Sequence, residues 1–395
     1  MKEKMKRLCA RVFKITVWAF LASIPTSAVF PSAASYPAPL LTGKRIAILA
    51  DDHFQIEEAL YALFRLKESG AEVKVVSHHS PAAVRDTYSL PTDMDPARAL
   101  SIEWDGVYIL GGFSPLEMRE DSRAIELVRR CAKRGGLVAA ICHGVVFLVP
   151  TGLLQGRHVT GSEVRVVELE NAGAIYHPTA PQIDGNLITA ISPGDNGPML
   201  DAMIHWFKGG EAEAKANLMN QYLNGKKVAI VLDNRFSLNQ YVYPLKRLFH
   251  NGAEVKVVAA EKTTLNERKQ GGVCVPDLTA VEALGLEFDA IILTGDWAAD
   301  TYRRNPDVLE FITKQLRKGK LVASINEGHT ALISARACGG YSFAVTWGSQ
   351  DDIANAGGKP LLQPVARDRN LITCAREEDM GGLIRELVAA LVEKK

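Results

Sequence analysis

One eight-residue segment occurs twice in this chain, once with reactive side chains and once without them. Residues 137–144 read LVAAICHG, and residues 321–328 read LVASINEG. The apolar positions are kept apart from Ala140, which becomes Ser324, whereas the cysteine and histidine of the first copy become asparagine and glutamate in the second. A repeated unit constrains the fold strongly, because both copies are expected to adopt the same architecture. The segment therefore predicts two copies of one domain, of which only the first keeps a reactive thiol.

The repetition extends over most of the chain at a nearly constant separation of 182 to 184 residues. Further matching segments lie at 43–49 and 225–231, at 70–76 and 252–258, and at 185–189 and 369–373. Chance similarity would not hold this register along a whole unit, so the repeat reflects a duplication. We expect four parts: a signal peptide at 1–34, a first domain at 44–209, a linker helix at 210–225, and a second domain at 226–395.

The first 34 residues have the composition of a secretory signal. Six basic residues precede an apolar stretch at 15–30, and small residues follow at 32–34. A basic start, a short apolar middle and a small-residue cleavage site are typical of such signals. The stretch is short for a membrane span and contains Pro25. We expect cleavage after Ala34 or Ala28 and an exported protein, periplasmic or secreted, with no stable membrane span; an uncleaved anchor is the alternative.

Bulk composition excludes some functional classes. The chain is 47% hydrophobic with a formal net charge of +1, which is typical of a globular protein and offers no electrostatic basis for a nucleic-acid partner. Six cysteines are present, five of them after the predicted signal. An odd and scattered set does not resemble a disulfide framework, so a free functional thiol is expected.

Short β-rich runs alternate with amphipathic segments in the first repeat. We expect buried strands at 45–50, 73–77, 107–110 and 137–141, and helices at 57–69 and 122–134. Alternating strands and helices predict a parallel sheet with helices on both faces. The fold class is therefore α/β, with two tandem doubly wound parallel-sheet domains.

Cys142 follows a predicted strand directly and precedes the small residue Gly144. A nucleophile between a strand and a helix sits on a strained turn that exposes it at the carboxyl edge of the sheet, where such folds bind ligands. The amino end of the following helix would stabilise the thiolate. The competing interpretation is a small core cysteine.

A pair of glycines, Gly111 and Gly112, ends the predicted strand that precedes this one in the chain. A backbone amide there could point to the same edge of the sheet. Together with the amide of His143 it would form an oxyanion hole for a carbonyl attacked by Cys142. The alternative for the two glycines is an ordinary turn.

Taken together, these segments resemble the DJ-1/PfpI family. The resemblance rests on AICHG at 140–144, LGG at 110–112, NAGA at 171–174, DGNLIT at 184–189 and PGD at 193–195. It covers residues 44–207 and, more weakly, 226–392. It implies flavodoxin-like domains of the class I glutamine amidotransferase type, arranged as an internal pseudo-dimer, with further homo-oligomers left open. It also implies catalysis without a cofactor or a metal.

The resemblance assigns roles to individual residues. Glu58 matches the family carboxyl that touches the cysteine, and His143 matches its general base or proton shuttle. Gly112 and His143 would supply the oxyanion hole, while Gly111 and Phe113 would line the substrate site. Without the resemblance, a glutamate early in a helix is explained by the helix dipole.

In some family members an acid from a neighbouring subunit orients the histidine. We expect Asp300 of the second domain to take this role beside His143. The second domain lacks the other groups: Gln240 replaces Glu58, and the glycine pair is matched with Thr294 and Gly295. It is therefore expected to be catalytically degenerate.

Three functions follow from these residues. The first is a glyoxalase III or deglycase type enzyme, in which a cysteine attacks small reactive aldehydes and converts methylglyoxal to lactate. The second is a cysteine peptidase or amidase of PfpI type acting on peptides. The third is a non-enzymatic redox sensor or stress-protective holdase. A two-lobed solute-binding protein is disfavoured, because in that class the chain usually crosses between the lobes.

Overall fold

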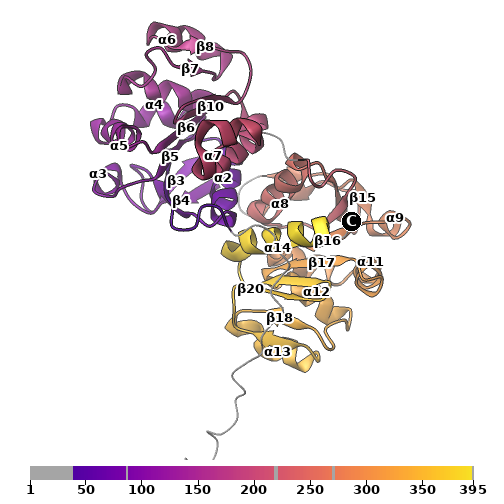
Figure 1. The fold of residues 1–395 in the computed structure, drawn as a ribbon. Helices are drawn as coiled ribbons and strands as arrows, with labels where there is room; N and C mark the ends of the chain where they lie inside the picture. Colours follow the sequence, from indigo (N-terminus) through magenta and orange to yellow (C-terminus); the bar gives the residue numbers. More distant parts are fainter. Residues whose placement is uncertain (1–38, 86–87, 218–220, 269–271, 394–395) are drawn as a thin grey trace, which may run out of the picture. The chain divides into compact units, whose positions relative to one another are not determined.

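The computed structural model describes residues 39–85, 88–217, 221–268 and 272–393 (Figure 1). The predicted signal peptide at 1–34 lies outside these ranges. The described residues form one compact unit that contains both repeats. Within the described ranges, no helix has both the length and the apolar character needed to cross a membrane.

The first repeat is built on a six-stranded sheet with the strand order β2-β1-β5-β6-β10-β9. Its strands are β1 (Arg45–Leu49), β2 (Glu72–Val76), β5 (Gly106–Ile109), β6 (Leu137–Ile141), β9 (Gln182–Asp184) and β10 (Leu187–Ala190). Every neighbouring pair is parallel except β9 and β10, which are antiparallel. The order reverses between β1 and β5, and this switch point is where doubly wound sheets bind ligands.

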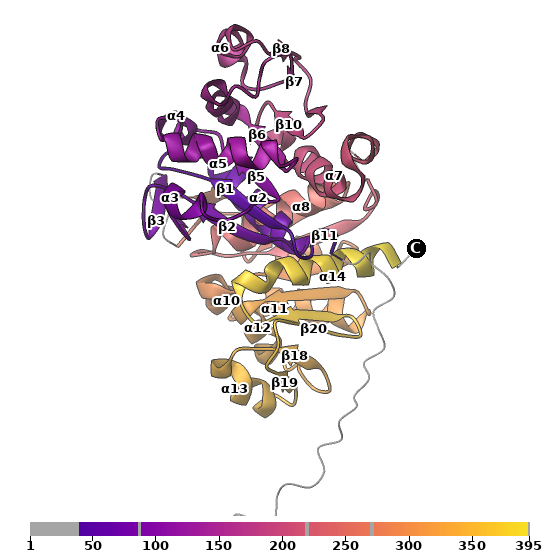
Figure 2. The same ribbon diagram turned by 60° about the vertical axis from the view of Figure 1, so that its left-hand side comes forward.

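Hydrophobic burial explains why these segments form central strands. All five residues of β6 and all four of β5 are buried, as expected for parallel strands covered on both faces. Helix α5 (Ser122–Lys133) contacts β5 and β6 and lies across one face of the sheet (Figure 2). Cys131 lies on its buried stripe, so this thiol belongs to the core.

The second repeat reproduces this arrangement. Its seven-stranded sheet has the order β15-β12-β11-β16-β17-β21-β20. The strands are β11 (Lys227–Val231), β12 (Glu254–Ala259), β15 (Leu278–Thr279), β16 (Ala290–Leu293), β17 (Leu321–Ile325), β20 (Val365–Asp368) and β21 (Leu371–Cys374). The core order matches strand for strand, which confirms two tandem doubly wound domains.

The predicted linker helix is shorter than the sequence suggested. Helix α7 (Asn196–Ala216) is interrupted at Gly209 and Gly210. The φ of Gly210, 70°, lies in the left-handed region. Helical structure resumes after this break and ends at Ala216, instead of continuing through 225. The two glycines allow the break because they carry no side chain that would oppose it.

The two repeats contact each other mainly through helices. Helix α2 (Ile56–Glu68) packs against α8 (Leu238–His250) and α14 (Met380–Glu393). At the centre of this contact, the Nε and Nη2 atoms of Arg247 each donate to the carboxylate of Glu68 at 2.8 Å, and both side chains are buried. Losing one partner of such a buried pair leaves an uncompensated charge, so the pair holds the repeats in one register.

Candidate active site

Cys142 directly follows the carboxyl end of β6 and has a φ of 58°. A non-glycine residue in the left-handed region is strained by about 1–3 kcal/mol and persists only where the surroundings enforce it. Gly144 contributes to that enforcement, since a Cβ there would lie 2.5 Å from the carbonyl oxygen of Ile109. The helix expected at this point is a 3₁₀-helix, which spans Cys142–Thr151.

Glu58 lies on the first turn of α2 and is fully buried. The backbone N–H of Gly111 donates to its Oε2 atom at 2.7 Å. A Cβ at Gly111 would lie 2.8 Å from both the Cys142 Cβ and Glu58 Oε2, so only glycine fits between them. The structure thus brings the carboxyl and the cysteine to opposite sides of one glycine.

Burial controls the protonation of Glu58. It raises the pKa of this carboxyl to about 8; the hydrogen bond from Gly111 opposes the shift and the charge of Glu57 adds to it. The Oε1 atom is buried and has no hydrogen-bond partner among the described residues. At neutral pH the carboxyl therefore holds its proton, and because Oε2 already accepts a hydrogen bond, Oε1 is the oxygen that can carry it.

The resting thiol differs from the low-pKa thiol that the sequence suggested. Burial, followed by the negative charge of an ionised Glu58, raises the pKa of Cys142 to about 11. The backbone N–H groups of His143 and Gly112 act in the opposite direction, because both hydrogen-bond to the sulfur. A proton on Glu58 removes the repulsive charge, so thiolate formation depends on the state of that carboxyl.

The Gly112 amide is held in place by the segment before α2. Gly112 has a φ of 76°, and a Cβ on it would lie 2.3 Å from the carbonyl oxygen of His53. The next residue, Phe113, donates its backbone N–H to that same oxygen at 3.0 Å. The two amides expected in the oxyanion hole, from Gly112 and His143, are therefore both positioned beside Cys142.

His143 lies next to the thiol, with its Nδ1 atom 3.4 Å from the sulfur of Cys142. Burial and then the charge of Arg165 lower the pKa of His143, and Glu168 partly opposes this. A neutral imidazole can accept a proton from the thiol. The Phe113 ring lies 6.2 Å from the imidazole between ring centroids and is 59% exposed, so it borders the site.

Arg165 and Glu168 were not identified from the sequence. They come from the short helices η2 (Glu163–Arg165) and α6 (Val166–Asn171) and form an ion pair of 2.7 Å. No motif marks them, and more than 20 residues separate them from Cys142 in the chain. Only the folded chain brings their charges near the histidine.

The structure does not bring Asp300 to His143. Asp300 lies on α10 (Asp296–Tyr302), has an exposed side chain, and pairs with Arg303 at 3.8 Å on the same helix. The charged groups that act on His143 come from the first repeat, as described above. Asp300 is not positioned as predicted because the repeats meet mainly through α2, α8 and α14, not through α10.

The matching site of the second repeat has the same backbone conformation but lacks the reactive side chains. Asn326 has a φ of 48°, so the strained turn is retained without a thiol. The N–H of Gly295 donates to Gln240 Oε1 at 2.6 Å, which reproduces the contact between Gly111 and Glu58. Gly295 is thus the structural counterpart of Gly111, and the sequence pairing with Thr294 was wrong by one position.

The counterpart of Gly112 in the second repeat is Asp296, with a φ of 56°. Its carboxylate accepts from Gln240 Nε2 at 3.2 Å and pairs with Arg268 Nη1 at 2.8 Å. The backbone N–H of Asp296, the counterpart of the Gly112 amide, donates instead to Glu327 Oε2 at 3.2 Å, and a carboxylate side chain is added at this position. This substitution disfavours a developing negative charge at the second site.

One group of three potential metal ligands occurs among the described residues. Ligand atoms of Asp51, His79 and Glu117 lie within 4.8 Å of one another. Both carboxylate oxygens of Asp51 already accept hydrogen bonds, including one from the backbone N–H of His78 at 2.9 Å, and His78 Nδ1 lies 2.6 Å from Oδ2. An ion here would compete with His78 for Asp51.

His78 itself connects three elements of the first repeat. Its Nδ1 atom contacts Asp51 after β1, and its Nε2 atom lies 2.8 Å from Asp121, which caps α5. Burial lowers the pKa of His78, but the hydrogen bonds with Asp121 and Asp51 outweigh it, so the pKa is raised. A protonated ring can donate to both carboxylates at once.

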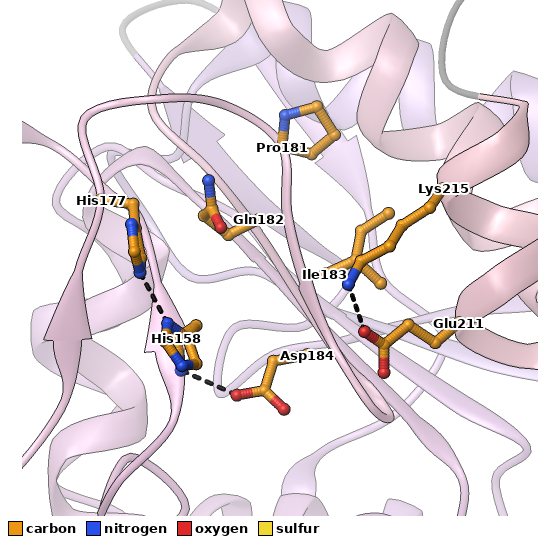
Figure 3. Close-up of a pocket in the computed structure, with 8 residues that line it drawn as sticks. All are labelled: His158, His177, Pro181, Gln182, Ile183, Asp184, Glu211 and Lys215. Carbon is orange, nitrogen blue, oxygen red and sulfur yellow. Dashed lines mark hydrogen bonds and ion pairs between the residues drawn. The ribbon is translucent and has the colours of Figure 1, made fainter.

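A separate surface pocket of about 410 Å³ lies between β9 and the end of α7 (Figure 3). In it the rings of His158 and His177 face each other, with Nδ1 of the first 2.6 Å from Nε2 of the second. Glu211 and Lys215 form an ion pair on the opposite wall. The pocket contains none of the predicted site residues.

Comparisons with known proteins identify the family of this chain. A model described as the DJ-1/PfpI family matches residues 44–205 and 226–390. Deglycase PfpI from Pyrococcus furiosus is 31% identical over 152 residues, which cover 38% of this chain and 92% of that protein. Putative cysteine protease YraA from Bacillus subtilis is 30% identical over 154 residues, covering 38% of this chain and 91% of its own length.

Among solved structures, a two-domain protein from Anabaena variabilis has DJ-1/ThiJ/PfpI-like and ferritin-like domains. It is 32% identical and covers 43% of this chain and 49% of its own, with a TM-score of 0.41. The single-domain relatives match about one repeat in length, whereas the family model matches both repeats and so most of the chain. This protein therefore belongs to the DJ-1/PfpI family as a member with two tandem domains.

Proposed function

We propose that the first repeat is a cofactor-independent cysteine enzyme that acts on small reactive carbonyl compounds, of the glyoxalase III or deglycase type. The observation that carries the proposal is the arrangement around Cys142. A strained thiol lies beside two backbone amides, with a carboxyl close by that keeps its proton at neutral pH. This combination suits addition of sulfur to a carbonyl carbon, because proton donation and oxyanion stabilisation converge on one atom.

The first step forms a hemithioacetal. His143 takes the proton of the thiol, and the sulfur of Cys142 forms a bond to the aldehyde carbon. The electron pair of the carbonyl moves to oxygen, which is stabilised by the amides of Gly112 and His143 and takes a proton from Glu58. The neutral state of His143 and the protonated state of Glu58 are both the resting states at pH 7.

With methylglyoxal, the following steps would be an internal proton shift and a hydrolysis. A base removes the proton from the carbon bonded to sulfur, and a proton is delivered to the neighbouring carbon, which gives the thioester of lactate. Water then cleaves the thioester, releasing lactate and restoring the thiol of Cys142. The reaction consumes one water molecule and needs no oxidant.

A peptidase or amidase is the second candidate, because the same sulfur could attack an amide and form an acyl-enzyme. The relatives carry both kinds of name, deglycase and putative cysteine protease. A redox sensor or holdase would use the same partly exposed thiol without turnover. The three functions differ in what is consumed and released.

The experiment compares the wild-type protein with Cys142→Ala and with Cys131→Ala, a control that removes a thiol from the core of the same repeat. Loss of methylglyoxal, formation of lactate and cleavage of an unstructured peptide are followed in parallel. We expect lactate formation by the wild type and the control, and at least a hundredfold loss in Cys142→Ala. Peptide cleavage without lactate would favour the amidase, and no turnover of either compound would exclude both enzymes.

A further inference from the structure

The segment at 160–168 lies against the strained turn of Cys142. The backbone N–H of Ser162 donates to the carbonyl oxygen of Cys142 at 3.3 Å, and a Cβ at Gly161 would lie 3.5 Å from that oxygen. Arg165 follows in the same turn, with its N–H donating to the carbonyl of Ser162 at 2.9 Å. These backbone hydrogen bonds therefore fix the turn that carries Arg165 against the Cys142 segment.

The guanidinium of Arg165 uses only part of its hydrogen-bonding capacity. Its Nη1 atom pairs with Glu168 at 2.7 Å, whereas its Nε atom is buried and has no partner among the described residues. A buried N–H without an acceptor is unfavourable. The free side of this planar group is therefore suited to an oxygen supplied by a ligand.

The charge of Arg165 also reaches the catalytic histidine. It acts on His143 more strongly than any other charged group does, and Glu168 is the next. A positive group at this position would attract an anionic oxygen of a substrate bound between His143 and Arg165. Glu168 limits this attraction because it neutralises part of the charge.

The second repeat loses this guanidinium together with the thiol. Ser349 ends the helix η5 (Trp347–Ser349) and stands 184 positions after Arg165, while Asp352 stands 184 positions after Glu168. An acidic residue is therefore kept at the second position, whereas serine replaces the arginine at the first. A purely structural role in the shared fold would not explain why the arginine disappears where the cysteine does.

We propose that Arg165 is a specificity-determining residue that binds a carboxylate carried by the substrate beyond its two reacting carbonyl groups. The preferred substrates would then be 2-oxoaldehydes that also carry a carboxylate, such as 4,5-dioxopentanoate, over neutral 2-oxoaldehydes such as methylglyoxal. Arginine suits this role because its planar fork matches a carboxylate and keeps its charge at any physiological pH. The substrate class rests on the proposed function, whereas the anion site itself does not.

The test uses alkylation of Cys142, which is independent of turnover. Iodoacetate and iodoacetamide form the same carbon–sulfur bond and release iodide, but only iodoacetate is an anion. The ratio of their second-order rate constants is measured by intact-mass spectrometry at pH 8 and low ionic strength. We expect this ratio to fall about three- to tenfold in Arg165→Gln and to rise in Glu168→Gln.

A matched control is Arg130→Gln, which removes an equal charge from a surface ion pair with Glu126 on α5. We expect the ratio to remain at the wild-type value in this variant. Added salt should reduce the effect of Arg165, since screening weakens attraction between exposed charges. An unchanged ratio in Arg165→Gln, or an equal fall in Arg130→Gln, would overturn the anion site.

Turnover supplies the second readout. In Arg165→Gln we expect kcat/KM to fall about tenfold for 4,5-dioxopentanoate, which the reaction converts to 2-hydroxyglutarate, mainly through KM, and little for methylglyoxal. Equal losses for both aldehydes would mean a structural role and would overturn the specificity. If the wild type converts neither aldehyde while the alkylation ratio responds to Arg165, the proposed function fails and the anion site stands.

Discussion

Replacing Glu58 by glutamine is expected to stabilise the first repeat, and increasingly so as the pH rises. Burial raises the pKa of Glu58 from 4.5 to about 8. Between these values the folded chain holds a proton that the unfolded chain has released. Stability from this group is therefore fully present below pH 4.5 and is lost as the pH rises through 8.

The size of the effect follows from the same pKa. Each unit between the folded and unfolded values corresponds to about 1.4 kcal/mol, so above pH 8 the wild type loses about 5 kcal/mol that an uncharged side chain would keep. At pH 5 the cost is only about 1 kcal/mol. Glutamine can replace the carboxyl without disturbing the backbone, because Gln240 makes the equivalent hydrogen bond with Gly295 at 2.6 Å.

The assay is urea unfolding at pH 5 and pH 9, followed by fluorescence; Trp104 is 4% exposed and reports on the first repeat. The matched control is Glu57→Gln, which alters an exposed neighbour paired with Lys246. We expect the stability gained by Glu58→Gln to grow by about 4 kcal/mol between the two pH values, and the control to change by less than about 1 kcal/mol. An equal gain at both pH values would refute the assignment of a buried protonated carboxyl.

Three further substitutions test the strain, the histidine bridge and the contact between repeats. Cys142→Gly should raise the free energy of unfolding by about 1 kcal/mol, since glycine adopts a φ of 58° without strain; a lower melting temperature would contradict this. His78→Ala should destabilise the protein more at pH 5.5 than at pH 9. Because the pKa of His78 is raised in the folded state, the stability that its protonated ring provides is fully present below the ordinary histidine pKa and is lost as the pH rises through the raised value. Urea unfolding at both pH values checks the sign of this difference. Glu68→Gln should cost about 3 kcal/mol in urea unfolding, because it removes the buried negative charge that Arg247 contacts at 2.8 Å, and a cost below about 1 kcal/mol would argue against a strong buried ion pair.

Local patterns account for the parts of the fold that the sequence predicted well. The four strands expected in the first repeat and the helices at 57–69 and 122–134 agree with the structure to within one residue at each end. These segments are marked by continuous apolar runs or by helical spacing, which depend only on neighbours in the chain. The linker was predicted less well, because a glycine pair can break a helix whose other residues favour it.

Catalytic assignments that depended on long-range packing had a different outcome. Asp300 was predicted beside His143 from an alignment of the two repeats, but its position depends on which helices form the contact between them. Arg165 and Glu168 lie near His143 although no sequence motif marks them. Spacing along a chain carries no information on which surface of one domain meets another.

By itself, the sequence determined that the chain is a duplicated α/β protein with a cysteine on a strained turn in one copy. Residue size and polarity at fixed spacing are sufficient for that conclusion. Only the tertiary structure decided that Glu58 keeps its proton and that the charge of Arg165 acts on His143. Both properties depend on solvent exclusion and on charges brought together from distant segments, and these exist only once the chain has packed.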